Sequence, residues 1–140
     1  MNRNQLKAEL ESGGYTCIAF DDNGQYFASK ARGIGPLHML CQKNTARSPL
    51  FVADKVIGKA AALLCAKCNV TTLYAQVVSK DALAVLAAHD IEVSYGTVAE
   101  FITNRAGTGK CPMELLAQDT DSPDEVFARV GAFLAQIAKA

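Results

Sequence analysis

The sequence has no tryptophan, only two histidines and no excess of charge of either sign. Its 14 Lys and Arg residues equal its 14 Asp and Glu residues, so no net field attracts a nucleic acid polymer or an anionic membrane. No apolar run approaches the roughly 20 residues that a membrane span needs, and the N-terminus lacks the apolar core of a signal peptide. We therefore expect a cytoplasmic protein that binds neither membranes nor polymeric nucleic acid.

Cysteine, by contrast, occurs five times. An odd number of cysteines without a secretion signal favours free thiols over a disulfide framework. Cys65 and Cys68 have the spacing of a metal-binding pair, but no second close pair accompanies them, and they end an apolar helical stretch. Cysteine in such a stretch is normally a small buried apolar residue. We predict no metal site and no cofactor.

The order of apolar segments predicts one α/β domain over residues 1–140, with a single mixed sheet flanked by helices. The pair Asn23-Gly24 tolerates the positive φ angles of a tight hairpin turn. Ser79 is a suitable N-cap for a helix that follows a strand rich in β-branched residues. The expected strands are 15–20, 25–29, 70–78 and 91–95, and the expected helices are 2–11, 37–43, 80–89, 113–118 and 123–139, with a short helix or turn at 98–104.

The segment LFVADKVIGKAAALLCAKC, residues 50–68, organises the chain. It predicts a short strand that ends before Asp54, then a charged turn, then a helix from about Gly58. The alanine-rich part has no polar side chain, and a helix that is apolar on every side belongs in a protein interior. Lys55 and Lys59 oppose the partial positive charge at the start of this helix. We therefore expect compensation there by Asp54, by another acid or by a bound anion.

The run GTGK at 107–110 suggests a phosphate-binding loop, but the spacing is wrong. The Walker pattern requires glycine where Asn104 stands and Ser or Thr where Cys111 stands. The run also follows a predicted helix or turn and not a strand. We reject this interpretation.

Cys111 is the candidate reactive thiol. It precedes Pro112 at the start of a helical turn that carries Glu114, and the positive end of such a turn favours the thiolate. Arg105 and Lys110 act in the same direction. The alternative is a loop cysteine without chemistry.

Three motifs together resemble the uncharacterised DUF1893 family: GIGPL at 33–37, DKVIGKAAALL at 54–64, and CPME at 111–114. The similarity covers nearly the whole chain. That family is similar in fold to the cytidine deaminases, with a helix, a hairpin and then strand–helix units in one sheet. The resemblance thus implies a cytidine deaminase-like fold.

The zinc site of the deaminases does not carry over to this sequence. The deaminase triplet His-Ala-Glu falls here on Gly58, Lys59 and Ala60, and the motif Pro-Cys-x-x-Cys falls on SKDAL at 79–83. Activation of water by zinc requires three nitrogen or sulfur ligands and a general acid/base, and none of these four residues is present. The resemblance implies the scaffold of a deaminase without its mechanism.

The resemblance also implies where a ligand would bind, at the start of the core helix and beside the end of the following strand. The ligand-binding residues predicted there and in the nearby loop are Asp54, Lys55, Gly58, Lys59, Ser79 and Arg105. Exposed amides at Gly58 and the charge of Lys59 suit a small polar or anionic ligand, nucleotide-like by analogy of fold. The alternative is that Lys59 pairs with Asp54 or Glu114 and fills a vestigial pocket.

Two functions therefore compete. The first is the binding of a small polar or anionic molecule without metal. The second is a metal-independent enzyme with Cys111 as nucleophile, assisted by Lys59, Arg105 or Glu114. No histidine is obviously placed to act as the base of this thiol, which favours binding. The expected partner is a small molecule. The sequence is compatible with both a monomer and a homo-oligomer.

Overall fold

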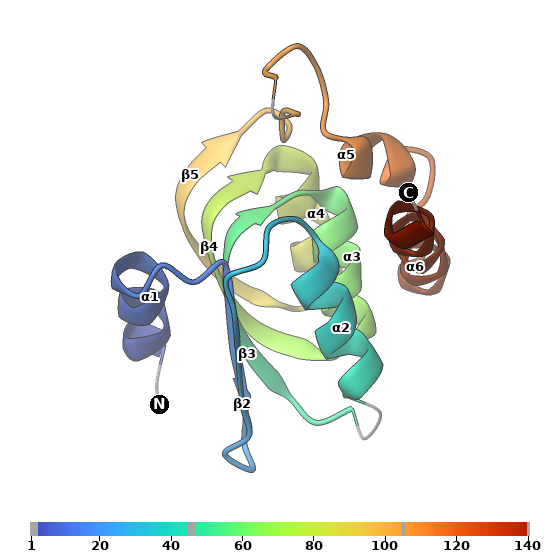
Figure 1. Cartoon of the computed structure of the whole chain (residues 1–140). Helices are drawn as coiled ribbons and strands as arrows, with labels where there is room; N and C mark the ends of the chain where they lie inside the picture. Colours follow the sequence, from blue (N-terminus) through green and yellow to red (C-terminus); the bar gives the residue numbers. More distant parts are fainter. Residues whose placement is uncertain (1–2, 45–46, 105, 140) are drawn as a thin grey trace.

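The fold is built on one mixed sheet of five strands, namely β1 (Cys17–Asp21), β2 (Tyr26–Ser29), β3 (Leu50–Ile57), β4 (Val70–Ser79) and β5 (Glu92–Ala99). The computed structural model describes residues 3–44, 47–104 and 106–139. The strand order is β2-β1-β3-β4-β5 (Figure 1). Strand β1 is antiparallel to β2 and β3, whereas β3, β4 and β5 are parallel. The predicted α/β fold with a mixed sheet is confirmed for these residues.

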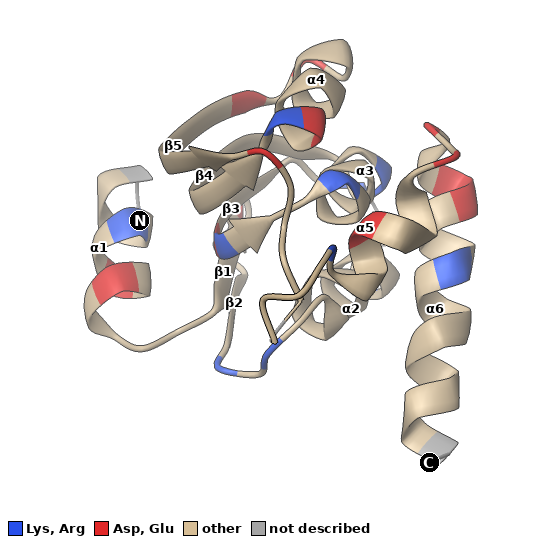
Figure 2. Ribbon diagram, turned by 90° about the horizontal axis from the view of Figure 1, so that it is seen from above, with Lys and Arg blue, Asp and Glu red and all other residues tan. Residues whose placement is uncertain are grey.

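Helices cover both faces of this sheet (Figures 1 and 2). They are α1 (Arg3–Ser12), α2 (Gly35–Lys43), α3 (Lys59–Lys67), α4 (Lys80–Ala88), α5 (Pro112–Ala117) and α6 (Pro123–Lys139). Helix α1 lies alone on one face, whereas α2, α3 and α4 lie on the other, and α6 packs on the outside of α3. Among the described residues, none of the helices combines the length and apolar character that crossing a bilayer requires.

Helix α3 lies at the centre of the core. Residues Ala60 to Cys65 are all buried, as predicted for a helix that is apolar on every side. Helix α3 contacts α2, α4, α5 and α6. On the other face, Leu6 and Leu10 of α1 pack against a smaller apolar cluster of the sheet that includes Tyr74. The larger apolar cluster lies on the α3 face and joins residues 60–65 of α3 to Val52 and Leu73 of the sheet.

Two predictions about strand ends are wrong. The charged turn predicted at Asp54 does not exist, because β3 continues to Ile57 and pairs with β1 on one side and β4 on the other. Pairing on both sides holds Asp54 and Lys55 in an extended conformation despite their low β propensity. The short helix or turn predicted at 98–104 is also wrong, since its first residues belong to β5.

Two predicted local features are confirmed. The side chain of Ser79 caps α4, because its Oγ accepts the backbone N–H of Ala82 at 3.1 Å. The hairpin between β1 and β2 turns at Gly24, whose φ of 82° lies in the left-handed region that glycine adopts without strain.

Candidate functional site

A cavity of about 320 Å³ lies where β3 ends and α3 begins. This volume falls within the range of about 300–1,000 Å³ that is usual for small-molecule sites. The walls come from the start of β1, the segment before α2, the end of β3, the first turn of α3 and the chain that leads into α5. In open α/β sheets, ligands bind in the crevice beyond the carboxyl ends of the strands, which is this position.

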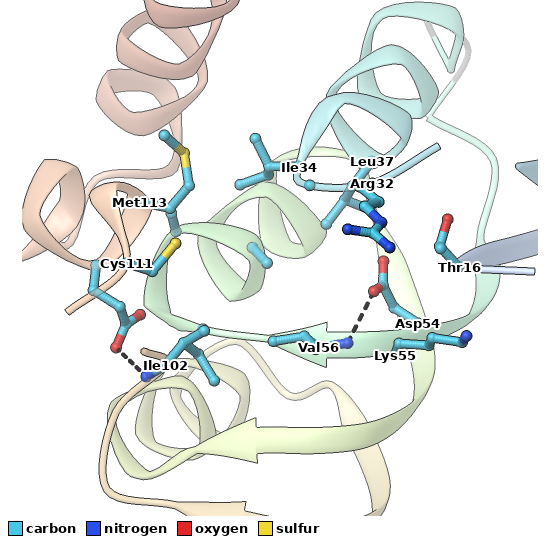
Figure 3. A pocket seen from close by; sticks show the side chains of 15 residues that line it. Thr16, Arg32, Ile34, Leu37, Asp54, Lys55, Val56, Ile102, Cys111 and Met113 are labelled. Atoms are coloured by element: carbon cyan, nitrogen blue, oxygen red, sulfur yellow. Dashed lines mark hydrogen bonds between the residues drawn. The ribbon is translucent and has the colours of Figure 1, made fainter. Parts of the chain in front are cut away.

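Most of the lining is apolar. In Figure 3, Ile34 and Leu37 lie on one side of the cavity and Met113 lies on the other. Val56, Ala61 and other small or aliphatic residues complete the surface between them. Such a cavity suits a flat or aliphatic group, and the few polar side chains in it decide the orientation of a ligand.

The polar lining residues gather at two ends, which we call the Asp54 end and the Glu114 end. The Asp54 end comprises Thr16, Arg32, Asp54 and Lys55. The Glu114 end comprises Cys111 and Glu114, with the apolar Gly58 and Ile102 beside them. Figure 3 shows Asp54 and Arg32 on one side of the cavity and Ile102 and Cys111 on the other. Glu114 belongs to the second side, because its Oε2 accepts the N–H of Ile102. The pocket therefore has a carboxylate at each end and apolar walls between them.

Asp54 is a half-buried acid of the strand β3. Burial raises the pKa of Asp54 to about 7, although hydrogen bonds from the N–H of Val56, the thiol of Cys17 and the N–H of Lys55 favour the ionised form. The Val56 N–H lies 3.2 Å from Oδ1 (Figure 3). Cys17 lies directly opposite Asp54 in the antiparallel register of β1 and β3. Asp54 therefore changes its charge near neutral pH.

Two cations lie at the Asp54 end. Arg32 is exposed, and its guanidinium points toward the Asp54 carboxylate (Figure 3). Lys55 is half-buried and belongs to β3. Both residues line the cavity, so this end offers an acceptor and cationic donors to a ligand.

Glu114 is the second carboxylate, and only 6% of the residue is exposed. Its Oε1 accepts the N–H of Lys59 at 3.0 Å, and its Oε2 accepts the N–H of Ile102 at 3.2 Å. The first of these amides opens α3, where the N-cap residue Gly58 supplies no side-chain hydrogen bond. Glu114 therefore caps α3 from a distant part of the chain, and its charge is favourable at the positive end of the helix.

Gly58 makes this cap possible. A Cβ at position 58 would collide with Oε1 of Glu114 and press on the side chain of Ile102. The sequence suggested that Gly58 leaves amides free for an external anion. In the structure the carboxylate of Glu114 holds the amide of Lys59 instead, so that expectation is corrected.

The predicted site residues do not all meet. Asp54, Lys55, Gly58, Cys111 and Glu114 line one cavity. Lys59 and Ser79 are not part of the described lining, and Arg105 lies outside the described residues.

The side chains of Lys59 and Ser79 have other partners. Nζ of Lys59 forms an ion pair with Asp121 at 3.1 Å, so Lys59 pairs neither with Asp54 nor with Glu114 as the alternative interpretation had it. Ser79 is fully buried, and its hydroxyl caps α4. A pocket role for these two side chains has no support in the geometry.

Cys111 is the only one of the five thiols that lines the cavity as described. Burial raises the pKa values of Cys17 and Cys65. The pKa of Cys41 is raised by a hydrogen bond with Cys68 and by burial. These thiols are poor nucleophiles, whereas Cys111 is half-buried and faces the cavity beside Met113 (Figure 3).

The residues of the pocket do not fit a deaminase zinc. Gly58, Lys59 and Ala60 provide none of the side chains that ligate zinc or shuttle its proton. Among residues 3–44, 47–104 and 106–139, no group of three or more His, Cys, Asp or Glu side chains could hold a metal ion.

Sequence reasoning missed Arg32 and Cys17. Arg32 directly precedes Gly33, whose φ of 83° redirects the chain toward α2, so the glycine-rich motif marked the neighbourhood but not the residue. The contact of Cys17 with Asp54 follows from the strand register, which the sequence did not give because β3 was predicted to end too early.

Comparison with known proteins gives a family match and a structural match. Residues 5–134 match the family model described as a domain of unknown function, DUF1893. Among solved structures, the chain is similar to a DUF1893 family protein from Thermotoga maritima, with 29% sequence identity and a TM-score of 0.79. This similarity covers 94% of the present chain and 91% of that chain. No curated protein sequence matches the chain.

Proposed function

The chain belongs to the DUF1893 family, and we propose that it binds a small, polar, nucleotide-like ligand in the pocket between β3 and α3. The observation that carries the proposal is Asp54. Its pKa of about 7 means that ionised Asp54 costs folding free energy at neutral pH. An uncharged residue would avoid this cost. A costly polar group inside an otherwise apolar cavity is typical of a binding site.

The lining suggests how such a ligand would lie. A flat heterocycle would fit between Ile34 and Leu37 on one side and Met113 on the other. Its ring N–H groups would donate to Asp54, and a phosphate or other anionic substituent would reach Arg32 at the edge. This arrangement satisfies the polar atoms of the ligand and buries its apolar face.

We extend the proposal to the cytidine deaminase-like fold. The order of elements supports it, with an N-terminal helix, a hairpin and then alternating strands and helices around one sheet. The analogy adds weight to a nucleotide-like ligand, but only by fold. Zinc-dependent deamination is not part of the proposal, because the residues of the site do not fit that metal. We also propose that the protein is located in the cytoplasm.

Thermal unfolding tests the binding function. We expect AMP or CMP to raise the melting temperature more than ribose 5-phosphate does, because only the nucleotides carry a base. Ala61→Met should abolish the rise by filling the cavity, since Ala61 lines it and is almost fully buried. The matched control is Ala84→Met, at an exposed position on α4. No response to either nucleotide, or an unchanged response in Ala61→Met, would contradict the proposal.

The second candidate function is a thiol enzyme, and one observation favours it: Cys111 faces the cavity. A base is the missing part. His38 is stacked on Phe127 and neither it nor the exposed His89 lines the described pocket. Limiting iodoacetamide followed by peptide mapping should label Cys111 first, more slowly with AMP present. Earlier labelling of Cys41 would remove the nucleophile of this candidate.

A further inference from the structure

We infer that Glu114 is an internal anionic ligand of the pocket, which closes the Glu114 end to anions and leaves it to the neutral or positively charged part of a ligand. The inference rests on the proposed binding function and narrows the class of ligand. It also sets the orientation of the bound ligand, whose anionic group, if it has one, lies toward Arg32.

The first step of the argument is that Glu114 occupies the place that an external anion would take. A free phosphate or carboxylate at a helix start binds backbone N–H groups. Here the two oxygens of Glu114 accept N–H groups from two separate segments, at Lys59 and at Ile102. The carboxylate thus joins α3, the chain after β5 and α5 in the way that a bound anion would.

The second step is that Glu114 is held in place. The residue is only 6% exposed, and the space beside its carboxylate exists only because Gly58 has no Cβ. An anion that entered this end would meet a carboxylate at short range with little water between them. Like charges repel strongly in such surroundings. A neutral or cationic group meets no such penalty.

The third step concerns the opposite end of the cavity. The lining cations Arg32 and Lys55 both lie at the Asp54 end, not at the Glu114 end. A ligand with an anionic substituent would therefore place it there. The part between the two carboxylates would carry hydrogen-bond donors and no negative charge. Aminated heterocycles and amidines have this chemistry.

Three fragments of the same shape and different charge test the inference. Benzamidine is cationic, benzamide is neutral and benzoate is anionic, and isothermal titration gives the dissociation constant of each. We expect the order benzamidine, then benzamide, then benzoate, with about tenfold or more between the first and the last. Benzoate that binds most tightly even in Arg32→Gln, which lacks the cation of the Asp54 end that would hold a carboxylate, would overturn the inference and leave the binding function standing.

A variant without the charge of Glu114 distinguishes the effect of this carboxylate from that of Asp54. Glu114→Gln keeps the length of the side chain and removes its charge, but its NH2 group cannot accept one of the two N–H groups that Glu114 accepts. We therefore compare fragments within the variant: the affinity for benzoate relative to that for benzamide should rise by about tenfold. The control Asp81→Asn removes one acid from the first turn of α4, where the residue is exposed, and should change neither constant. Equal changes for all three fragments in Glu114→Gln would mean a general loss of structure and would overturn the inference.

Rescue by a free carboxylate keeps the test decisive if the fragments bind weakly. Acetate should raise the melting temperature of Glu114→Ala in a saturable way at constant ionic strength, or restore its folding if the variant is unfolded in chloride. Wild type should not respond. If acetate rescues Glu114→Ala but no fragment binds wild type, the internal ligand stands and the binding function fails. If acetate has no effect on Glu114→Ala, the internal ligand fails.

Discussion

Two carboxylates lie at opposite ends of one pocket, and their surroundings differ. Glu114 is almost fully buried, and each of its oxygens accepts a backbone N–H from a different segment. Asp54 is half-buried and receives its hydrogen bonds from its own strand and from the thiol of Cys17. Burial outweighs these bonds at Asp54 and raises its pKa to about 7. At Asp54, therefore, the hydrogen bonds do not offset the cost of burying the charge, whereas Glu114 has a backbone N–H for each of its oxygens.

This difference separates an architectural acid from a candidate functional one. Glu114 closes a helix start and ties three parts of the pocket wall together, so its charge contributes to the fold. The charge of Asp54 destabilises the fold near neutral pH, and a ligand with hydrogen-bond donors would relieve that cost. Burial alone would have singled out Glu114, which is the more deeply buried of the two acids.

The largest expected effect is at the architectural acid. Glu114→Ala should lower the free energy of unfolding by about 3 kcal/mol, because two partly buried N–H groups lose their acceptor. Urea titration at neutral pH measures this change.

A double-mutant cycle with Gly58 sharpens this prediction. Gly58→Ala alone should also destabilise, since its Cβ displaces the carboxylate of Glu114. In the Glu114→Ala background the added Cβ has room, so the cost of Gly58→Ala should fall by about 1 kcal/mol or more. Additive losses in the double variant would contradict the close contact between the two residues.

The second effect, at Asp54, has the opposite sign. The folded-state pKa of Asp54, about 7, lies above the ordinary value of 3.8, so the folded state binds the proton more tightly than the unfolded state. The resulting stability is fully present below about pH 4 and is lost as the pH rises through about 7. Asp54→Asn removes this dependence. We expect it to raise the free energy of unfolding by about 1–3 kcal/mol at about pH 8 and to have little effect at about pH 4.

Urea titrations across this pH range check the difference between wild type and Asp54→Asn. Asp81→Asn, an exposed acid on α4, serves as the control and should show no such rise. A destabilised Asp54→Asn at about pH 8 would mean that the ionised carboxylate supports the fold, and the contrast with Glu114 would disappear.

Local sequence patterns predicted most of the fold. The apolar circumference of α3, the cap at Ser79 and the turn at Gly24 each depend on a few neighbouring residues. The predicted ends of β3 and β5 were wrong, because pairing with neighbouring strands determines where these strands end. From the sequence alone, the charged residues Asp54 and Lys55 favour a turn. In the structure they belong to β3, because β1 and β4 pair with this strand on its two sides.

The site was predicted only in part, for a geometric reason. Successive residues of a helix point about 100° apart, so Ala61 faces the cavity while the side chain of Lys59, two residues earlier, turns away to Asp121. Sequence reasoning named Glu114 as one possible partner of Lys59, but through the ammonium group and not through the backbone N–H. The oxygens of Glu114 bind backbone N–H groups that every residue carries, and no side-chain pattern marks the ones at Lys59 and Ile102.

The smallest expected effect concerns the side chain of Lys59, which belongs to neither carboxylate. Its ion pair is with Asp121, whose side chain is 89% exposed, and such pairs contribute about 0–1 kcal/mol. The stem of Lys59 is mostly buried, so Lys59→Met is the better variant because it keeps the apolar part. We expect Lys59→Met and the control Asp121→Asn to lower the free energy of unfolding by similar amounts, below about 1 kcal/mol each, in urea titration. A loss of several kcal/mol in Lys59→Met alone would mean that the ammonium group neutralises a buried acid. Glu114 would then depend on a cation as well as on backbone N–H groups, and its contrast with Asp54 would need a different explanation.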